Sequence, residues 1–388
     1  MLVYTAHAVA IAGNALANAE NTTKDAAMSA VAEWLIYGAY GYSGQLIVRQ
    51  AVDRGLRPVL GGRDQARLKA MAEPLGLSTR TFAVDEVGAL KQGLDGINLV
   101  LNCAGPFSAT AASMLEGCLQ LGAHYLDISG EIEVFRHAHA QDQRARSRGL
   151  VVCPGVGFDV VPTDCMAALL KRELADAQRL ILAFDAGGGP SPGTAKTAVE
   201  GLAGGGWVRR DGQLTRVPSF SRTREIDFGQ GPRQTVCVPW GDVYSAFVTT
   251  RIPDIEVYMA MPRRLIERVR RVRYGLALLR LPPLQWWLKR RLGGRVSGPD
   301  EAIRSDSPCR LWAEAVASDG RRVSARMVTP NGYDLTAEAS IRVAERLLRG
   351  AGQEGGYYTP SKLMGADFVR TLDGVQLVLS GASFDSDQ

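Results

Sequence analysis

The sequence lacks the features of several common protein classes. It has only four histidines and six cysteines, with no C-x-x-C pair and no cysteine at metal-ligand spacing from a histidine, so we expect no structural zinc site. No Ser-His-Asp or Cys-His arrangement is visible, which argues against nucleophilic hydrolysis. No run of about 18 uncharged apolar residues occurs, so we expect no membrane-spanning helix. The scattered cysteines in apolar runs favour a reducing, cytoplasmic compartment without disulfides.

An excess of positive charge is confined to one region. The chain of 388 residues is 46% hydrophobic and 22% charged, which is ordinary for a globular protein of two or three domains. Residues 263–295 contain ten arginines and one lysine against the single acid Glu267, a net of +10; because the whole chain carries +5, the rest carries −5. This imbalance predicts one localised basic surface on a mildly acidic protein.

The N-terminal region lacks both core periodicity and the early positive charge of a secretory signal, because no Lys or Arg precedes Lys24. Met28 begins a segment that leads directly into an apolar run. We therefore predict that residues 1–30 are an N-terminal extension upstream of a natural start, with a weak targeting segment as the alternative.

A glycine loop follows the first apolar run. Residues 34–37 are apolar and typical of a buried parallel strand, and residues 45–52 have helical apolar spacing. Between them the glycines allow a tight turn, close approach of a pyrophosphate, and close packing of helix on strand. We predict a dinucleotide-binding loop whose cofactor-binding residues are Gly38, Tyr40, Gly41, Tyr42, Ser43 and Gly44. The spacing is G-x-x-G-x-x-G and not G-x-G-x-x-G, so a glycine-rich turn without ligand is the alternative.

The second predicted strand, residues 57–63, ends in Gly-Gly-Arg. An NAD site usually has an acidic residue here for the ribose 2′-OH, whereas a guanidinium suits the 2′-phosphate of NADP. Arg63 therefore favours NADP(H) over NAD(H). The alternative is a solvated Arg63, with Asp64 on the ribose.

Further strand and helix patterns predict a doubly wound, Rossmann-type α/β domain over residues 31–156. Strands are expected at 81–85, 98–103, 124–128 and 150–153, with a helix at about 109–121. Ligands gather at the carboxyl edge of such a sheet. We predict that further cofactor contacts come from Asp85, Cys103, Ala104, Gly105 and Pro106.

Polar residues at these strand ends are candidates for proton transfer, which hydride transfer often requires. A lone acid in a loop is more often a helix cap or turn former, but these acids cluster in two glycine-flanked loops. A lysine near the start of a predicted helix at 194–202 is a further candidate, although Ser191 and Thr194 can be simple caps. The candidate catalytic residues are Tyr125, Asp127, Glu131, Asp159 and Lys196.

For residues 157–345 we predict a second, mixed α+β domain for substrate binding or dimerisation. Residues 346–388 are expected to form a C-terminal tail. Strand-like runs at 180–184, 235–238, 246–250, 255–259, 310–317 and 321–328 suggest an antiparallel sheet.

Four ordered motifs resemble the saccharopine dehydrogenase-like oxidoreductases. They are YGAYGYSG at 37–44, NCAGPF at 102–107, YLDISGE at 125–131 and GFDVVPTD at 157–164. The sequence is most similar to the branch of trans-acting enoyl reductases and saccharopine dehydrogenase-like proteins, although SPGT at 191–194 departs from the Ser-Gly-Gly-Thr of that branch. The resemblance implies an NAD(P)-binding Rossmann domain, a second domain that often forms a homodimer interface, and a tail that packs back on the first domain.

From the resemblance we expect an NADPH-dependent reductase acting on a C=C or C=N bond of a hydrophobic or acyl substrate. An amino-acid dehydrogenase of the saccharopine type is one alternative. A non-catalytic NADP-binding scaffold or sensor at membranes is another.

The basic segment 262–295 combines an apolar stripe, at 265, 269, 272, 276 and 279, with flanking arginines and a Trp286-Trp287 pair. Tryptophan beside arginine is typical of helices that lie at a membrane interface. The segment predicts either peripheral binding to a membrane surface or binding to an acidic acyl-carrier protein. A packed helix with a solvated arginine face is the alternative, and no nucleic-acid partner is expected because no reading module accompanies the patch.

Overall fold

The computed structural model describes residues 33–187, 189, 191, 205–272, 298–350 and 352–383. The predicted extension at 1–30, the candidate Lys196 and residues 273–295 of the basic segment lie outside the described residues.

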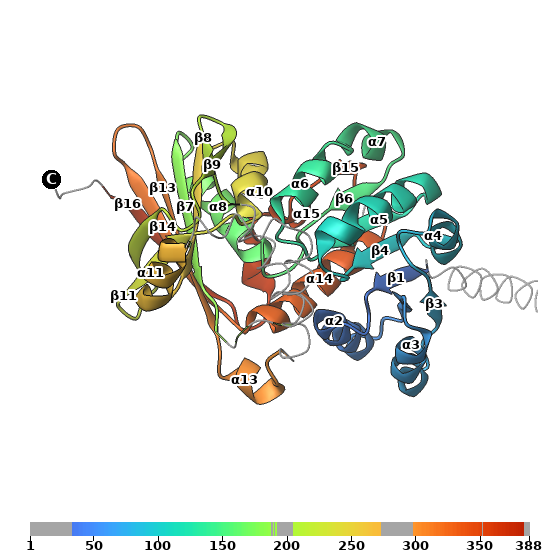
Figure 1. Ribbon diagram of the computed structural model, residues 1–388. Coiled ribbons are helices and arrows are strands. Elements are labelled where there is room, and N and C mark those ends of the chain that lie inside the picture. Colours follow the sequence, from blue (N-terminus) through green and yellow to red (C-terminus); the bar gives the residue numbers. More distant parts are fainter. Residues whose placement is uncertain are drawn as a thin grey trace, which may run out of the picture. The chain divides into compact units, whose positions relative to one another are not determined.

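The first sheet, sheet A, is a seven-stranded parallel sheet (Figure 1). Four short apolar strands form its centre because their residues are buried on both faces, the usual state of parallel strands between helices. The Rossmann-type prediction is confirmed. In spatial order the strands are β15 (Gly356–Tyr357), β6 (Val151–Cys153), β5 (His124–Asp127), β4 (Leu99–Asn102), β1 (Trp34–Tyr37), β2 (Val59–Gly62) and β3 (Thr79–Thr81).

Helices connect these strands in the alternation that the sequence predicts. They are α2 (Tyr42–Asp53), α3 (Gln65–Ala72), η1 (Glu73–Leu75), α4 (Val87–Leu94), α5 (Phe107–Leu121), α6 (Ile132–His139) and α7 (Asp142–Ser147). The third strand lies at 79–81 and not at the predicted 81–85, because Phe82 and Val84 leave the ladder and pack into the core instead.

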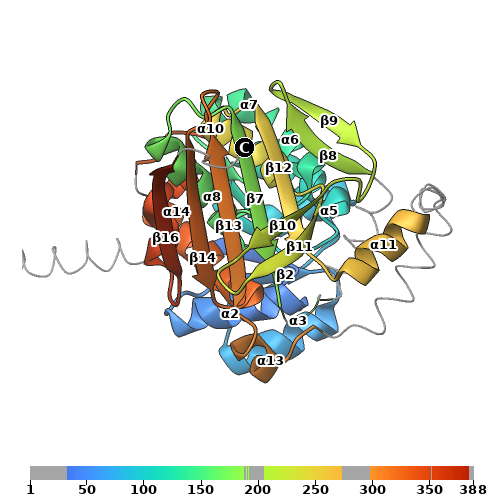
Figure 2. The ribbon, with the colours of Figure 1, turned by 90° about the vertical axis from the view of Figure 1, so that its left-hand side faces the viewer.

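The second sheet, sheet B, has nine strands and is mixed. The expected antiparallel pairing holds for most neighbours, but β12 runs parallel to β7, with Ile255 opposite Leu180. The main path is β10 (Thr223–Asp227), β11 (Pro232–Cys237), β12 (Asp254–Ala260), β7 (Arg179–Asp185), β13 (Cys309–Val316), β14 (Arg322–Thr329) and β16 (Gln376–Ser383), with β8 (Gly206–Arg210) and β9 (Gln213–Val217) beside β12. The strands face the viewer in Figure 2.

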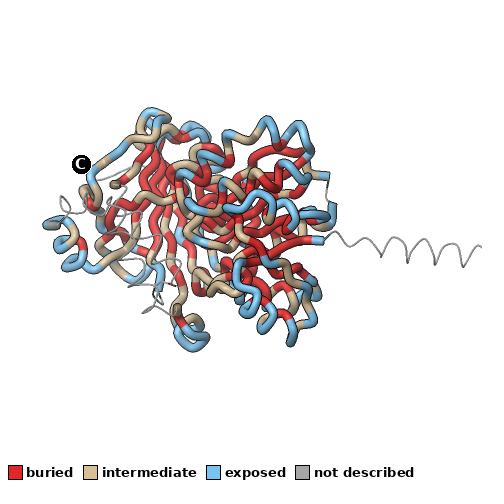
Figure 3. The backbone as a smooth tube through the Cα atoms, turned by 45° about the vertical axis from the view of Figure 1, so that its right-hand side comes forward, coloured by how far each residue is buried: buried red, intermediate tan, exposed pale blue. Residues whose placement is uncertain are grey.

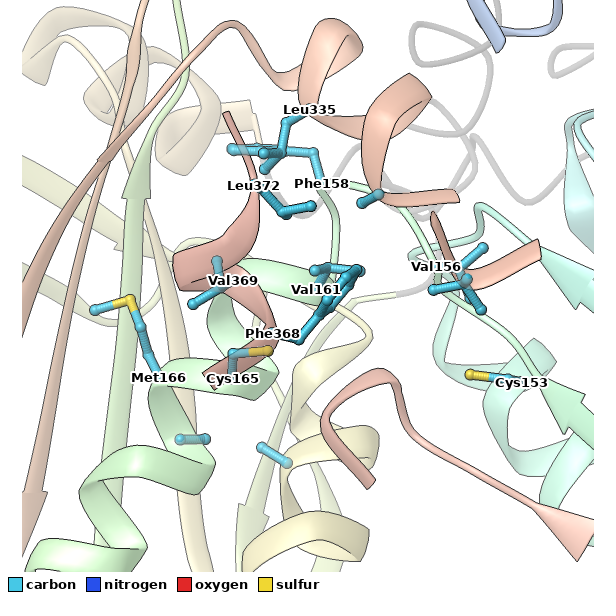
Figure 4. Close-up of a cluster of buried hydrophobic side chains, with 14 of the residues drawn as sticks. Cys153, Val156, Phe158, Val161, Cys165, Met166, Leu335, Phe368, Val369 and Leu372 are labelled. Atoms are coloured by element: carbon cyan, nitrogen blue, oxygen red, sulfur yellow. The ribbon is translucent and has the colours of Figure 1, made fainter. Parts of the chain in front are cut away.

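One face of sheet B packs against helices. Successive side chains along each strand therefore point alternately to the helix-covered face and to the opposite face. Leu180, Leu182 and Phe184 of β7 belong to a large apolar core. The same core includes residues of sheet A such as Cys153, drawn in Figure 4, and Figure 3 colours the buried stretches of the chain red. Helix α8 (Val161–Glu173) contacts β7, β13 and β14, and α10 (Asp242–Thr250) contacts β8 and β12. The other helices after residue 205 include α11 (Arg263–Val272), α13 (Glu301–Ser305), α14 (Gly332–Leu348), α15 (Pro360–Met364) and η3 (Ala366–Thr371). In the described residues, no helix has the length and apolar character needed to cross a membrane.

The predicted strand at 246–250 is wrong, because these residues form the last turns of α10. The β-branched residues of this segment are typical of a strand. In the structure, however, Ala246 and Val248 are buried residues of a helix, and the Thr250 hydroxyl donates to the Ala246 carbonyl at 2.6 Å. The C-terminal residues serve both sheets: β15 extends sheet A and β16 forms an edge of sheet B.

Candidate coenzyme and proton-transfer site

The glycine loop joins β1 to α2 at the carboxyl edge of sheet A. Gly38 has a φ of 81°, and a Cβ there would lie 2.8 Å from the backbone nitrogen of Ala104. A Cβ on Gly44 would lie only 2.3 Å from the Gly38 carbonyl oxygen. The loop is therefore packed as closely as a dinucleotide-binding loop requires. A residue larger than glycine at position 38 or 44 would collide with the neighbouring backbone.

The start of α2 is suited to an anion. Gly41 is its N-cap and provides no side-chain cap. The first backbone N–H groups of a helix have no intrahelical acceptors, so those of Tyr42, Ser43 and Gly44 can donate to a pyrophosphate.

The segment after β4 lies against this loop and is held by buried polar groups. Asn102 accepts from the Ala104 N–H at 3.1 Å and donates to the Thr110 hydroxyl at 3.2 Å, and Thr110 donates to the Ala104 carbonyl at 2.6 Å. The predicted cofactor residues Cys103, Ala104, Gly105 and Pro106 are thus placed beside the glycine loop, with a cis Gly105-Pro106 peptide. Burial raises the pKa of the Cys103 thiol, so the structure offers no reason to assign it nucleophilic chemistry.

The end of β2 carries two exposed arginines around one tyrosine. The Arg63 N–H donates to the Tyr40 hydroxyl at 3.2 Å, and the Arg67 guanidinium lies 4.4 Å from the centre of the Tyr40 ring. Asp64, the acid that could have bound a ribose, is the N-cap of α3 and accepts from the Arg67 N–H at 3.1 Å. Sequence reasoning missed Arg67. Its position, three residues after an aspartate that caps a helix, was the signal that could have found it.

Tyr42 points away from the loop, toward residues near α13 and α14. Its hydroxyl bonds to the Pro299 carbonyl, and Arg304 approaches that hydroxyl at 3.3 Å. Its ring meets the Tyr333 ring edge-on at 4.8 Å. The side chain of Tyr42 therefore links the loop to the rest of the chain, and only its backbone N–H is available to a phosphate. Asp85 is exposed, four residues beyond the end of β3.

Tyr125 and Asp127 form a buried pair at the end of β5. The Tyr125 hydroxyl donates to Asp127 at 2.7 Å, and the other carboxylate oxygen accepts from the N–H groups of Ser129 and Gly155, both at 2.9 Å. Burial raises the pKa of Asp127 to about 6. Neither side chain is exposed, so the pair fixes two loops at the carboxyl edge of the sheet.

Glu131 is the N-cap residue of α6, and its carboxylate reaches the start of α5, next to the segment that contacts the glycine loop. Its two oxygens accept from the N–H groups of Phe107, at 2.9 Å, and Ser108, at 2.8 Å. A carboxylate at a helix N-terminus is stabilised in its charged form. The predicted acid therefore lies at the coenzyme edge as a capping anion.

Asp159 is a carboxyl group whose surroundings shift its pKa toward neutral pH. Burial, and then the charge of Glu131, raise the pKa of Asp159 to about 7. Its carboxylate lies over Gly130, where a Cβ would be 2.9 Å from the Asp159 Oδ2. A carboxyl group with this pKa can exchange a proton near neutral pH.

Residues 239–242, which sequence reasoning passed over, complete this cluster. The Trp240 indole N–H donates to the Asp159 carbonyl at 2.7 Å, and its ring lies 4.8 Å from that of Phe184. Asp242 is fully buried, accepts from the Thr163 hydroxyl at 2.8 Å, and has one oxygen without a hydrogen-bond partner among the described residues. Burial raises the pKa of Asp242 well above its usual range. A Pro-Trp-Gly-Asp sequence signals a turn, but nothing in it signals contact with residue 159.

The remaining predictions have simple outcomes. Lys196 and Thr194 lie outside the described residues, while the Ser191 N–H donates to the Tyr333 hydroxyl at 2.6 Å. The six cysteines form no disulfide with one another in the structure. Within the described ranges, no cluster of potential ligands could hold a metal ion.

Comparisons with known proteins agree with this geometry. Residues 34–153 match the family described as the saccharopine dehydrogenase NADP binding domain. A probable mitochondrial saccharopine dehydrogenase-like oxidoreductase of Arabidopsis thaliana is 29% identical over 151 residues, covering 34% of this chain and 33% of that protein. A trans-acting enoyl reductase of Mycobacterium ulcerans is 26% identical over 155 residues, covering 37% of this chain and 36% of that protein.

The match thus spans about a third of the length of these relatives. Among solved structures, the apo, histidine-tagged saccharopine dehydrogenase (L-Glu forming) of Saccharomyces cerevisiae has a TM-score of 0.61 at 10% identity. The structural match covers 90% of this chain and 100% of the yeast chain, and it shows that the two chains share a fold. The comparisons thus match residues 34–153 to the saccharopine dehydrogenase NADP binding domain, within a fold that is shared with the yeast enzyme.

Proposed function

We propose that the chain is an NADPH-dependent reductase that reduces a C=C (enoyl) or C=N bond of a hydrophobic or acyl substrate. The observation that carries the proposal is the carboxyl group of Asp159, with a pKa raised to about 7, in contact with the loop that ends in Glu131. Glu131 in turn caps the helix that follows the coenzyme segment. The fit of a dinucleotide loop beside a proton-exchanging acid supports a reductase.

The preference for NADPH rests on the end of β2. Arg63 and Arg67 offer fork-shaped donors to a 2′-phosphate, and the Arg67 guanidinium lies 4.4 Å from the centre of the flat Tyr40 ring. Asp64 is engaged at the N-terminus of α3, so its carboxylate is less available to a ribose 2′-OH. A bound nicotinamide coenzyme supplies the hydride.

The residues of the chain supply the proton and the shape of the site. Asp159 in its acid form donates a proton to the substrate atom opposite the hydride acceptor. Burial, and then charge repulsion by the Glu131 carboxylate at the start of α5, keep the pKa of Asp159 high. Trp240, which is partly buried, offers an apolar surface to a hydrophobic substrate, and Phe184 packs against its ring from the core.

The same surroundings favour an uncharged or acyl substrate over a dicarboxylate. Glu131 is a carboxylate at this site, and Asp159 joins it in the charged form above about pH 7, so a substrate rich in carboxylates would be repelled. The name of the mycobacterial relative, a trans-acting enoyl reductase, supports the enoyl class.

The test is NADPH oxidation with a panel of enoyl thioesters and cyclic imines, using the wild-type chain, Asp159→Asn and the exposed control Asp95→Asn. We expect Asp159→Asn to lose kcat by about 100-fold, the usual size of a general-acid contribution, with the NADPH dissociation constant unchanged. Unchanged turnover in Asp159→Asn would remove the assigned donor. Tight NADPH binding without turnover of any substrate would favour a non-catalytic scaffold.

We also propose that the basic segment 262–295 binds an anionic partner, either a membrane surface or an acidic acyl-carrier protein. Support comes from α11, where Ile266 is buried, Val269 is partly buried, and the side chain of Leu265 is 43% exposed among exposed arginines. Glu267 pairs with Arg263 at 3.1 Å. Cosedimentation with anionic liposomes, compared with titration of an acyl-carrier protein, separates the two partners.

A further inference from the structure

A groove lined by arginines lies at the opposite end of α2 from the glycine loop. Its volume is about 630 Å³, and its walls include Arg54 just after α2, Arg342, Arg346 and Arg349 along α14, and residues 364–368. The 12 residues of α2 separate it from the coenzyme loop by roughly 18 Å of helix. A ligand in this groove would not compete with a dinucleotide at the glycine loop.

Positive charge exceeds negative charge along the groove. Four guanidinium groups line it, against the carboxylates of Glu345 and Asp367. Glu345 is engaged by Arg54, with two hydrogen bonds of 2.8 and 2.9 Å. Asp367 is engaged by Arg172, at 2.8 Å, and by a further arginine, so it neutralises charge outside the groove.

The arginines of α14 differ in how far they are neutralised. Arg342 has a carboxylate partner, Glu338, at 2.7 Å. Arg346 donates to the neutral amide of Gln353 at 3.2 Å, and Arg349 reaches Glu345 only at 3.7 Å with a side chain that is 76% exposed. The C-terminal dipoles of α2 and α14 offset part of this positive charge.

Two guanidinium N–H groups in this cluster are buried and have no acceptor among the described residues. They are the Nε groups of Arg342 and Arg346. Buried donors without acceptors are rare and commonly mark a missing water or ion. Repeating guanidinium groups at steps of four and three on one helix face present their donors to a single ligand.

From these observations we propose that the groove of Arg54, Arg342, Arg346 and Arg349 is a binding site for a small phosphate-bearing anion. Guanidinium groups bind phosphate oxygens through paired, charge-assisted hydrogen bonds. The groove is larger than inorganic phosphate needs, and Met364 and Phe368 add an apolar side to it. These features favour a phosphate monoester with a short carbon skeleton.

Such a ligand would connect elements that are distant in sequence. It would bridge α2, whose other end begins at the coenzyme loop, to α14 and to residues 364–371. Because only the folded chain assembles this groove, bound ligand would raise the thermal stability of the protein.

The test is calorimetric titration of the full chain with inorganic phosphate and with glycerol phosphate, at constant ionic strength and with NADPH saturating the coenzyme site. The variants are Arg346→Gln/Arg349→Gln and the matched control Arg144→Gln, an exposed arginine of α7 paired with Glu116. We expect saturable binding, tighter for the ester, that the double variant weakens by at least about tenfold, the loss of one charge-assisted hydrogen bond.

Repeating the titration on Arg63→Ala/Arg67→Ala shows whether the coenzyme site accounts for the binding. Loss of phosphate binding in that variant, with retention in Arg346→Gln/Arg349→Gln, would overturn the proposal. Absence of saturable binding of either anion would overturn it too. Should the double variant fold poorly, the single change Arg349→Gln, on a side chain that is 76% exposed, provides the same comparison.

Discussion

At the scale of single residues, coenzyme choice depends on the side chains at the carboxyl end of β2. Arg63→Ala and Arg67→Ala each remove a guanidinium from the place expected for a 2′-phosphate, and Asp64 stays engaged at the start of α3. We expect each change to weaken NADPH binding by about 1.5–3 kcal/mol, the value of a hydrogen bond to a charged group, and to leave NADH binding nearly unchanged. Calorimetry with both coenzymes measures this, and equal losses for NADPH and NADH would contradict the 2′-phosphate assignment.

Asp159 gives a second residue-scale prediction, the pH dependence of the reaction. Its pKa is raised to about 7 by burial and by Glu131, and the acid form is the proton donor. The rate of reduction should therefore be highest below about pH 7 and fall as pH rises through that value.

The profile of kcat/KM between pH 5 and 9 checks this for the wild-type chain and for Glu131→Gln, which removes the repelling charge. The variant should titrate at lower pH, because one of the two causes of the raised pKa is gone. An identical profile in both proteins would show that Glu131 does not act on the titrating group.

At the scale of elements, the approach of α2 to β1 depends on the third glycine of the loop. In Gly44→Ala the added Cβ would lie 2.3 Å from the Gly38 carbonyl oxygen, so the helix has to move. We expect a loss of about 1–3 kcal/mol in the free energy of unfolding, the usual cost of overpacking, together with weaker binding of both coenzymes.

Gly88→Ala in α4 is a matched control for that change, because no atom lies within 4 Å of its added Cβ. Helical alanine should raise the free energy of unfolding by about 0.5–1 kcal/mol there. Denaturant unfolding measures both variants. A Gly44→Ala chain as stable as the wild type would show that the loop has room that the structure does not indicate.

The same elements show what the sequence could predict. The glycine loop, β1, β4 and β5 are local patterns of buried apolar runs ending in glycine or acid, so their positions were predictable. The role of Glu131 was not, because its carboxylate caps a helix that begins 24 residues earlier in the chain. Contact between Trp240 and residue 159 joins segments 81 residues apart, and no local pattern encodes it. Residues 246–250 were misassigned because β-branched side chains are common in buried helices that tertiary packing stabilises.

At the scale of the whole molecule, buried carboxyl groups impose a pH dependence on stability. Burial raises the pKa of Asp127 from 3.8 to about 6 and is the main cause that raises the pKa of Asp159 from 3.8 to about 7. The folded chain therefore binds more protons than the unfolded chain between about pH 4 and pH 7, and these groups lower the free energy of unfolding as pH rises through that range. His124 and His139 act in the opposite sense, because burial lowers their pKa values and their contribution is lost as pH falls.

Because these effects oppose one another, the contribution of a single acid is best isolated by comparing variants. Asp159→Asn cannot ionise, so the decrease in its free energy of unfolding from pH 4 to pH 8 should be smaller than that of the wild type. The difference should be at most about 4 kcal/mol, the value for a pKa shift of this size in a group that is not fully exposed. Asp95→Asn, at an exposed position, should follow the wild-type curve. Urea unfolding at each pH measures all three proteins, and parallel curves for wild type and Asp159→Asn would mean that residue 159 is ionised in the folded chain as readily as in the unfolded one. In that case the acid could not serve as a proton donor near neutral pH, so the stability measurement also tests the chemistry assigned to the site.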